Sequence, residues 1–180
     1  YVDLNNIVLT GTTTGDAYYP QVAALLHFDG VNGSTVITDN SKNNLYVTAS
    51  NGAAISTAQS KFGGASVLFD GTNDNLTIAS NSVFDFGTND FTIEFWWYPT
   101  ANNRRFDILD FWNPSATNMT RLDIGFAITG NIELYTDNGC SINSGQNPTV
   151  NQWTHIALTR SSGSLNFWVN GVQKGSISCN

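Results

Sequence analysis

The sequence FTIEFWWYPT, residues 91–100, is the most aromatic stretch of the chain and contains one of its two glutamates. Its residue types alternate with a period of two, which predicts a β-strand. One face would carry Phe91, Ile93, Phe95 and Trp97, and the other Thr92, Glu94, Trp96 and Tyr98. The first face is typical of a core. The second face combines aromatic rings with a carboxylate, which leaves three interpretations: a catalytic surface, a sugar-binding surface, or the far side of a sheet that is buried on both faces.

The composition favours an all-β domain. A chain of 180 residues fits one domain with a sizeable core. Only 12% of the residues are charged, compared with about a quarter in average globular proteins. Asparagine, serine and threonine together supply about a third of the residues, and these residue types favour turns and strands over helix interiors. The composition therefore favours a secreted or surface-exposed all-β domain over a helical bundle.

The charge pattern excludes two classes of partner. The net charge is -7, and the basic residues are scattered except for Arg104 and Arg105. Such a chain has no basic stripe for phosphates, so we expect no nucleic-acid binding. No apolar run approaches the length of a membrane-spanning helix, so we expect no membrane insertion.

Short alternating or apolar runs recur between turn signals, as in a β-sandwich. Asn170-Gly171 is the strongest hairpin signal, because both residues tolerate positive φ. Residues 1–20 are expected to form an arm or linker, and residues 21–180 the folded domain. We expect strands at residues 23–29, 45–48, 53–57, 65–70, 75–79, 91–98, 106–112, 120–127, 131–136, 153–160, 164–169 and 172–177.

The expected core combines apolar residues from both ends of the domain: Leu26, Phe28, Leu68, Phe91, Ile93, Phe95, Ile156, Leu158, Phe167 and Val169. The two cysteines, Cys140 and Cys179, flank expected strands. They are too few for a disulfide scaffold and lack the spacing of a zinc site. One structural disulfide and two unpaired thiols both remain open.

Three stretches together resemble the laminin-G-like branch of the concanavalin A-like lectin/glucanase superfamily. They are LLHFDGVNGSTVITDNSKNN, FGGASVLFDG with the following DFTIEFWW, and WTHIALTRSSGSLNFWVNGV. The resemblance runs from about residue 22 to residue 175. It implies a two-sheet antiparallel jelly roll, usually a non-catalytic recognition or adhesion module. Such domains occur in secreted bacterial proteins and in phage virion proteins, which implies an extracellular, cell-surface or virion-surface location.

The same superfamily contains β-glucanases, which need two carboxylates at a defined separation. No acidic residue shares the strand face of Glu94, and Glu133 belongs to another hairpin. Asp107 and Asp110 lie three residues apart, which predicts opposite strand faces. We therefore expect no enzymatic activity.

Aromatic residues are the candidates for ligand binding. Trp96 is either part of the sheet packing or a platform on which a sugar ring stacks. Trp168 is the better candidate, because Leu165, Phe167 and Val169 would form the inward face of its strand. The full candidate set is Trp168, Trp96, Tyr98 and Trp112.

By position in the resembled family, FDG…TDNSKNN corresponds to a loop that holds calcium. Asp39 would be the main ligand, with Ser41 and Asn44 nearby, since hard cations prefer oxygen ligands. The alternative is that Asp39 and Ser41 make only turn hydrogen bonds.

The resemblance supports two functions: a module that binds glycans or a cell-surface polysaccharide, and a structural virion or surface-layer protein. In the resembled family a further strand follows SISCN, residues 176–180, and pairs beside the first core strand. We find no counterpart of that strand in these 180 residues, which would leave a sheet edge unpaired. Residues 1–20 could cover this edge within the same chain, or could add a strand to a neighbouring subunit.

We expect addition to a neighbouring subunit, and hence a homo-oligomer or assembly. The remaining alternative is that the sequence continues beyond residue 180.

Overall fold

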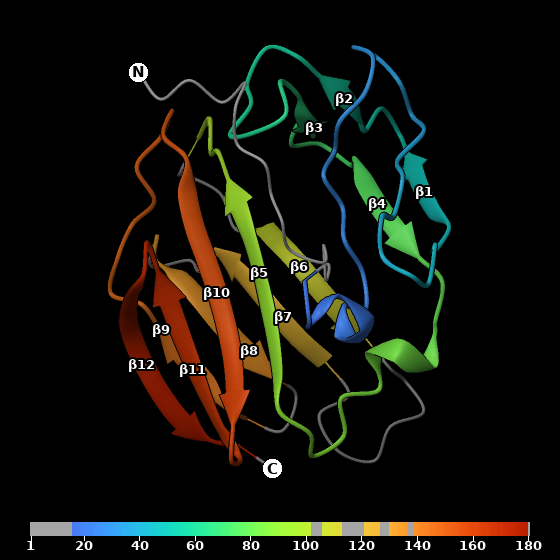
Figure 1. The fold of residues 1–180 in the computed structure, drawn as a ribbon. Helices are drawn as coiled ribbons and strands as arrows, with labels where there is room; N and C mark the ends of the chain where they lie inside the picture. Colours follow the sequence, from blue (N-terminus) through green and yellow to red (C-terminus); the bar gives the residue numbers. More distant parts are fainter. Residues whose placement is uncertain (1–15, 102–105, 113–120, 127–129, 137–138, 180) are drawn as a thin grey trace, which may run out of the picture. The chain divides into compact units, whose positions relative to one another are not determined.

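The computed structural model describes residues 16–101, 106–112, 121–126, 130–136 and 139–179 (Figure 1). Most of the expected N-terminal arm, residues 1–15, therefore lies outside the described residues. The side chains of residues 106, 112, 121–124 and 126 are also not described. Two compact units divide the chain, one ending at Ala79 and the other beginning at Ser80.

The second unit contains two four-stranded antiparallel sheets (Figure 1). The first sheet has the order β12-β11-β10-β5 and is called the tryptophan sheet below. Its strands are β5 (Phe91–Trp97), β10 (Thr154–Ser161), β11 (Ser164–Val169) and β12 (Val172–Ser178). The second sheet has the order β6-β7-β8-β9, with strands β6 (Phe106–Trp112), β7 (Arg121–Phe126), β8 (Ile132–Thr136) and β9 (Ser141–Asn143).

The first unit contains two smaller antiparallel pairs, β1 with β4 and β2 with β3. Their bounds are β1 (Val47–Ser50), β2 (Ala54–Ser56), β3 (Ser66–Leu68) and β4 (Asn75–Ile78). The described helices are single 3-10 turns, η2 (Tyr19–Gln21) and η3 (Ser82–Phe84). No helix in the described part of the chain is long and apolar enough to span a membrane. The all-β class expected from the sequence is confirmed.

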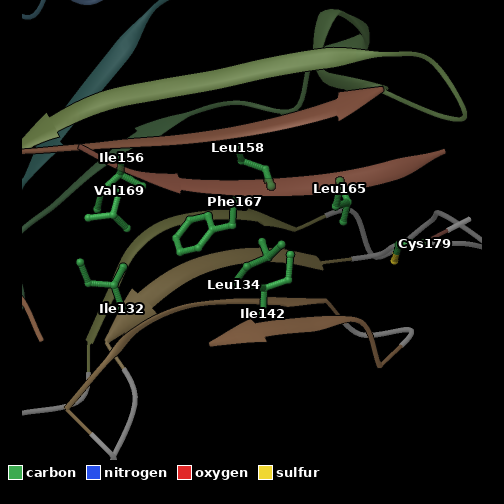
Figure 2. Packing of buried hydrophobic residues seen from close by; sticks show 9 residues of the cluster. All are labelled: Ile132, Leu134, Ile142, Ile156, Leu158, Leu165, Phe167, Val169 and Cys179. Atoms are coloured by element: carbon green, nitrogen blue, oxygen red, sulfur yellow. The ribbon is translucent and has the colours of Figure 1, made fainter. Parts of the chain in front are cut away.

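The main core lies between the two sheets of the second unit (Figure 2). On β11 the burial pattern alternates, and Leu165, Phe167 and Val169 are buried as predicted. Ile156 and Leu158 of β10 are fully buried opposite them. The predicted core residues of β5 are half-buried and pack against this cluster.

The prediction that Leu68 belongs to the core is wrong. Leu68 is 55% exposed, although Ile55, on the paired strand, is 1% exposed. The register pairs Ala54 with Leu68 and Ile55 with Val67. Because neighbouring residues of a strand point to opposite faces, Leu68 lies on the face opposite to Ile55. Leu26 and Phe28 are half-buried and pack against the smaller core of the first unit.

The prediction of a strand at residues 23–29 is also wrong. This segment makes only an isolated bridge between Leu26 and Asp39. The backbone N–H of Leu25 donates to the Asp39 carboxylate, and Phe28 has a φ of 58°, which a strand cannot contain. Conversely, the structure contains a strand, β9, that the sequence analysis did not predict. It is only three residues long, which is too short for a clear alternating pattern.

The two hairpin turns of the tryptophan sheet follow the sequence signals. Asn170 and Gly171 have φ values of 51° and 74°, so both central residues of the β11–β12 turn lie in the left-handed region as predicted. Ser162 and Gly163 do the same between β10 and β11. Such turns match the twist of the paired strands and fix their register.

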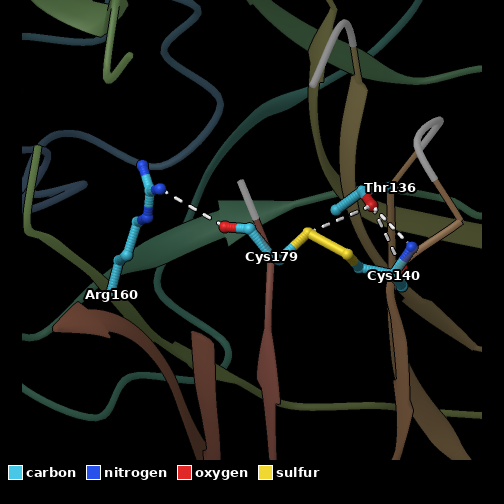
Figure 3. The surroundings of a disulfide bond; sticks show 4 residues. All are labelled: Thr136, Cys140, Arg160 and Cys179. Carbon is cyan, nitrogen blue, oxygen red and sulfur yellow. Dashed lines mark hydrogen bonds between the residues drawn. A yellow bond between two sulfur atoms is a disulfide. The ribbon is translucent and has the colours of Figure 1, made fainter. Parts of the chain in front are cut away.

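A disulfide joins the two sheets of the second unit. Cys140 precedes β9 and Cys179 follows β12, and their sulfur atoms are bonded (Figure 3). Arg160 lies beside this link, is 3% exposed, and donates from Nη2 to the carbonyl of Cys179 at 3.3 Å. Its Nη1 donates to the carbonyl of Gly87 at 2.6 Å. These bonds connect the end of β12 to the loop before β5.

Candidate functional site

The tryptophan sheet has one face on the core and one face toward solvent. Trp96, on the solvent face, is 37% exposed, so this sheet is not buried on both sides. This solvent face is called the outer face below. From the strand registers and the alternation of side chains, its members are Thr92, Glu94, Trp96, His155, Ala157, Thr159, Asn166, Trp168, Gln173 and Ser176.

The first cluster on the outer face is built around Trp96. Its strand partner on β10 is His155, and the indole and imidazole centroids lie 5.0 Å apart at 42°. The Nε2 atom of His155 lies 3.3 Å from Oε2 of Glu94. The Glu94 side chain remains 63% exposed and that of His155 24%. The cluster therefore offers solvent an aromatic ring beside an exposed carboxylate.

The second aromatic residue of the outer face is Trp168 on β11. It pairs with Ala157, while its indole nitrogen donates to Oγ1 of Thr159 at 3.3 Å. Thr159 lies two residues beyond Ala157 on β10, so the ring extends along the sheet surface instead of standing away from it. Ala157 is only 8% exposed although it belongs to the outer face, as expected beneath such a ring. The Trp168 indole is half-buried, so part of it remains open to solvent.

Polar side chains of β11 and β12 also lie near Trp168. Nε2 of Gln173 donates to Oδ1 of Asn166 at 3.0 Å. This bond leaves each amide with further donors or acceptors for a ligand. The outer face thus combines aromatic rings with amides and hydroxyls, the groups that recognise sugar rings and their hydroxyls.

Among the four predicted aromatic residues, Trp96 and Trp168 lie on the same face of one sheet. Tyr98 follows β5 and is half-buried, with its ring 5.3 Å from that of Trp153. Trp112 belongs to β6, which is part of the other sheet, and its side chain lies outside the described residues. The sequence gives no binding role to His155, Ala157 or Thr159, because only the strand pairing places them beside the tryptophans.

One expectation about carboxylates is wrong. A register shift between Asp107 and Leu109 pairs Asp107 with Gly125, and Asp110 with Asp123. Gly125 and Asp123 are two residues apart on β7, so Asp107 and Asp110 point to the same side of the sheet, not to opposite sides. Both are exposed. The cause is a β-bulge, which changes the alternation that the sequence pattern assumes.

The predicted calcium ligands form a compact hydrogen-bonded turn in the first unit. Asp39 is 3% exposed. Its Oδ1 accepts from the N–H groups of Leu25 at 2.8 Å and Ser41 at 2.9 Å. Its Oδ2 accepts from Oγ of Ser41 at 2.7 Å and from the N–H of Leu45 at 2.8 Å.

These four donors fill the acceptor positions of the carboxylate. Among the described residues, no group of three or more His, Cys, Asp or Glu side chains could hold a metal ion. Asn44 is exposed and donates its N–H to the carbonyl of Ser41 at 3.3 Å. A cation held by Asp39, Ser41 and Asn44 would have to displace the N–H and O–H donors that already satisfy this carboxylate, so the hydrogen-bonded turn is the arrangement that this structure describes.

The same hydrogen bonds determine how Asp39 titrates. Burial alone raises the pKa of this carboxyl group. The hydrogen bonds from Leu25, Leu45 and Ser41 favour the charged form and outweigh burial, so the pKa is lowered below its ordinary value. Asp39 is thus an ionised group whose hydrogen bonds hold the backbone at Leu25, Ser41 and Leu45 together.

The model of the concanavalin A-like lectin/glucanases superfamily (the laminin-G-like family) matches residues 70–180. The chain belongs to this superfamily. The matched range includes both sheets of the second unit, and hence the whole outer face. The resemblance seen in the sequence motifs is therefore confirmed.

Two solved structures have a similar fold, and each match covers 87% of this chain. One is an S-layer domain-containing protein from Clostridium thermocellum, with 25% identity, a TM-score of 0.53 and 72% of its chain covered. The other is domain 4 of an extracellular arabinanase from Geobacillus stearothermophilus in complex with arabinotriose, with 18% identity, a TM-score of 0.58 and 76% of its chain covered. No curated protein sequence matches the chain. The similar structures come from an extracellular protein and from an S-layer domain-containing protein.

Proposed function

We propose that this chain is a non-catalytic module of an extracellular protein that binds glycans on the outer face of the tryptophan sheet. The observation that carries the proposal is the pair of outward tryptophans. Trp96 is 37% exposed and Trp168 lies along the sheet surface, while the inward residues of the same strands fill the core. Outward aromatic rings on a rigid sheet, one exposed and one half-buried, suit sugar stacking, because little side-chain entropy is lost on binding.

Two further observations support the proposal. The arabinanase domain, which shares the fold, was solved with arabinotriose. The Cys140–Cys179 disulfide suits a protein that works outside the cell, where thiols are oxidised. The expected absence of catalysis belongs to the proposal too: Glu94 shares the outer face with no second carboxylate among the four described strands.

A glycan array followed by a pull-down with insoluble polysaccharide tests the proposal. Binding is expected for the parent chain and is expected to weaken in Trp96→Ala and Trp168→Ala. Tyr135→Ala is the matched control, because Tyr135 is a 45% exposed aromatic residue on β8 of the other sheet. Loss of binding in the control alone, or no binding at all, would refute the proposal. Release of soluble sugars from the bound glycan would refute its non-catalytic part, and Glu94→Gln and Asp107→Asn would then locate the activity.

The similarity to the S-layer domain-containing protein favours a second candidate, a structural subunit of a surface layer. This function would use protein–protein contacts instead of glycan contacts. Light scattering over a concentration series distinguishes the two: a surface-layer subunit is expected to assemble into a repeating lattice, and the glycan module is expected to bind sugars without assembling. The proposed assembly through residues 1–20 is tested in the same way by deleting residues 1–16.

A further inference from the structure

The position of the two outward tryptophans constrains the length of a ligand. Trp96 pairs with His155, and Trp168 pairs with Ala157, so the two residues lie on strands that flank β10 and are offset by two residues along it. Two strand spacings and two residue rises place their Cα atoms about 12 Å apart. The Trp168 ring extends further away, toward Thr159. One sugar ring cannot stack on both indoles.

The groups between the two tryptophans constrain the charge of a ligand. His155 and Ala157 lie between them on β10, and the His155 imidazole is in contact with the exposed carboxylate of Glu94. A carboxylate accepts hydrogen bonds from sugar hydroxyls and repels acidic sugars. Lys174, at the irregular β12 register, and the buried Arg160 are the basic side chains of these four strands besides His155. The net charge of -7 adds to the repulsion of an anionic polymer.

From these two constraints we infer that the outer face binds a neutral oligosaccharide that crosses β5, β10 and β11 obliquely, with one sugar on Trp96, another on Trp168, and at least one sugar between them beside Glu94 and His155. This inference rests on the proposed glycan-binding function and specifies its ligand. The two indoles act as linked contacts, so the second stacking interaction forms at a high effective concentration once the first has formed. A monosaccharide reaches only one of them.

The inference is tested by isothermal titration calorimetry with neutral arabino-oligosaccharides and cello-oligosaccharides as probes, from monosaccharide to hexasaccharide. Affinity is expected to rise at least tenfold between the monosaccharide and the trisaccharide or tetrasaccharide, and then to level off. Trp96→Ala and Trp168→Ala are each expected to remove most of this rise, and the Tyr135→Ala control is expected to keep it. Oligogalacturonides of equal length are expected to bind at least tenfold more weakly, and Glu94→Gln is expected to reduce that difference.

Different failures have different meanings. A monosaccharide that binds as tightly as the longer probes overturns the inference, as does a loss of affinity in only one tryptophan variant. Tighter binding of oligogalacturonides than of neutral probes also overturns it. In these three outcomes the proposed glycan binding still stands. If no probe binds and the glycan array is negative, the proposed function and the inference fail together. Thermal unfolding of each variant verifies that the fold is kept, which is expected because both indoles lie outside the core.

Discussion

Removing the Cys140–Cys179 disulfide tests how the second unit holds its two sheets together. The bond closes a loop with a sequence separation of 39. In the chain-entropy model, a loop of this length restricts the unfolded chain enough to stabilise the fold by about 4 kcal/mol. We expect the double variant Cys140→Ala/Cys179→Ala to lose about this amount.

A second effect adds to the loss. The Cys179 carbonyl accepts a hydrogen bond from the buried guanidinium of Arg160, and the Gly87 carbonyl is the other described acceptor. Nε of Arg160 already has no hydrogen-bond partner among the described residues. If the end of β12 loosens, a buried cation loses one of two acceptors, which costs more than the loss of an exposed hydrogen bond.

Urea unfolding followed by tryptophan fluorescence measures the effect. All five tryptophans follow Ser80, so the signal reports on the second unit. The m-value is expected to rise in the double variant, because an unfolded chain without the link exposes more surface. Dithiothreitol is expected to produce the same loss in the parent chain and none in the variant. A loss below about 1 kcal/mol with an unchanged m-value would refute the reasoning, since it falls within the range of ordinary substitutions.

Further predictions concern packing and the Asp39 loop. Phe167→Ala should cost about 3–5 kcal/mol in urea unfolding, because Phe167 is fully buried, whereas Leu68→Ala should cost far less. Gly175→Ala should cost about 1–3 kcal/mol, because an added Cβ would clash with Cγ2 of Ile142 in the core; unchanged stability would contradict this contact. Because the pKa of Asp39 is lowered on folding, its stabilising effect should be present above about pH 4 and be lost as the pH falls through the lowered pKa. Asp39→Asn should reduce this acid sensitivity in tyrosine-detected unfolding, and EDTA followed by excess calcium should leave the melting temperature unchanged; a rise with calcium would restore the cation interpretation.

The sequence predicts best where short-range sterics decide the structure. The alternation on β11 and the Asn170-Gly171 turn depend on residues within one hairpin, and both agree with the structure. Leu68 differs because its face is decided by the register with β2, not by its own strand. A pattern of apolar residues tells which residues share a face, and pairing tells which face meets the core.

Features that depend on long-range pairing could not be predicted. The bulge that brings Asp107 and Asp110 to one side arises from the pairing of β6 with β7 and leaves no mark in the sequence FDILDF. The same holds for Asp39, whose donors include Leu25, 14 residues away. The sequence predicted that the Asp39 carboxylate organises this loop, whether through turn hydrogen bonds or through a bound cation. Only the position of the backbone N–H groups distinguishes a turn that satisfies the carboxylate from one that offers it to a cation.

On the tryptophan sheet, the alternation of side chains places core residues and candidate binding residues on opposite faces of the same strands. Phe95 and Phe167 face inward and contribute to the core, while their neighbours Trp96 and Trp168 face outward. Trp96 keeps 37% of its surface exposed and packs its indole against His155, outside the core cluster that Phe95 joins. Trp168 pairs with Ala157, a small and buried residue of the outer face. The proposed glycan binding would use the outward rings of these strands, whereas the inward rings stabilise the fold.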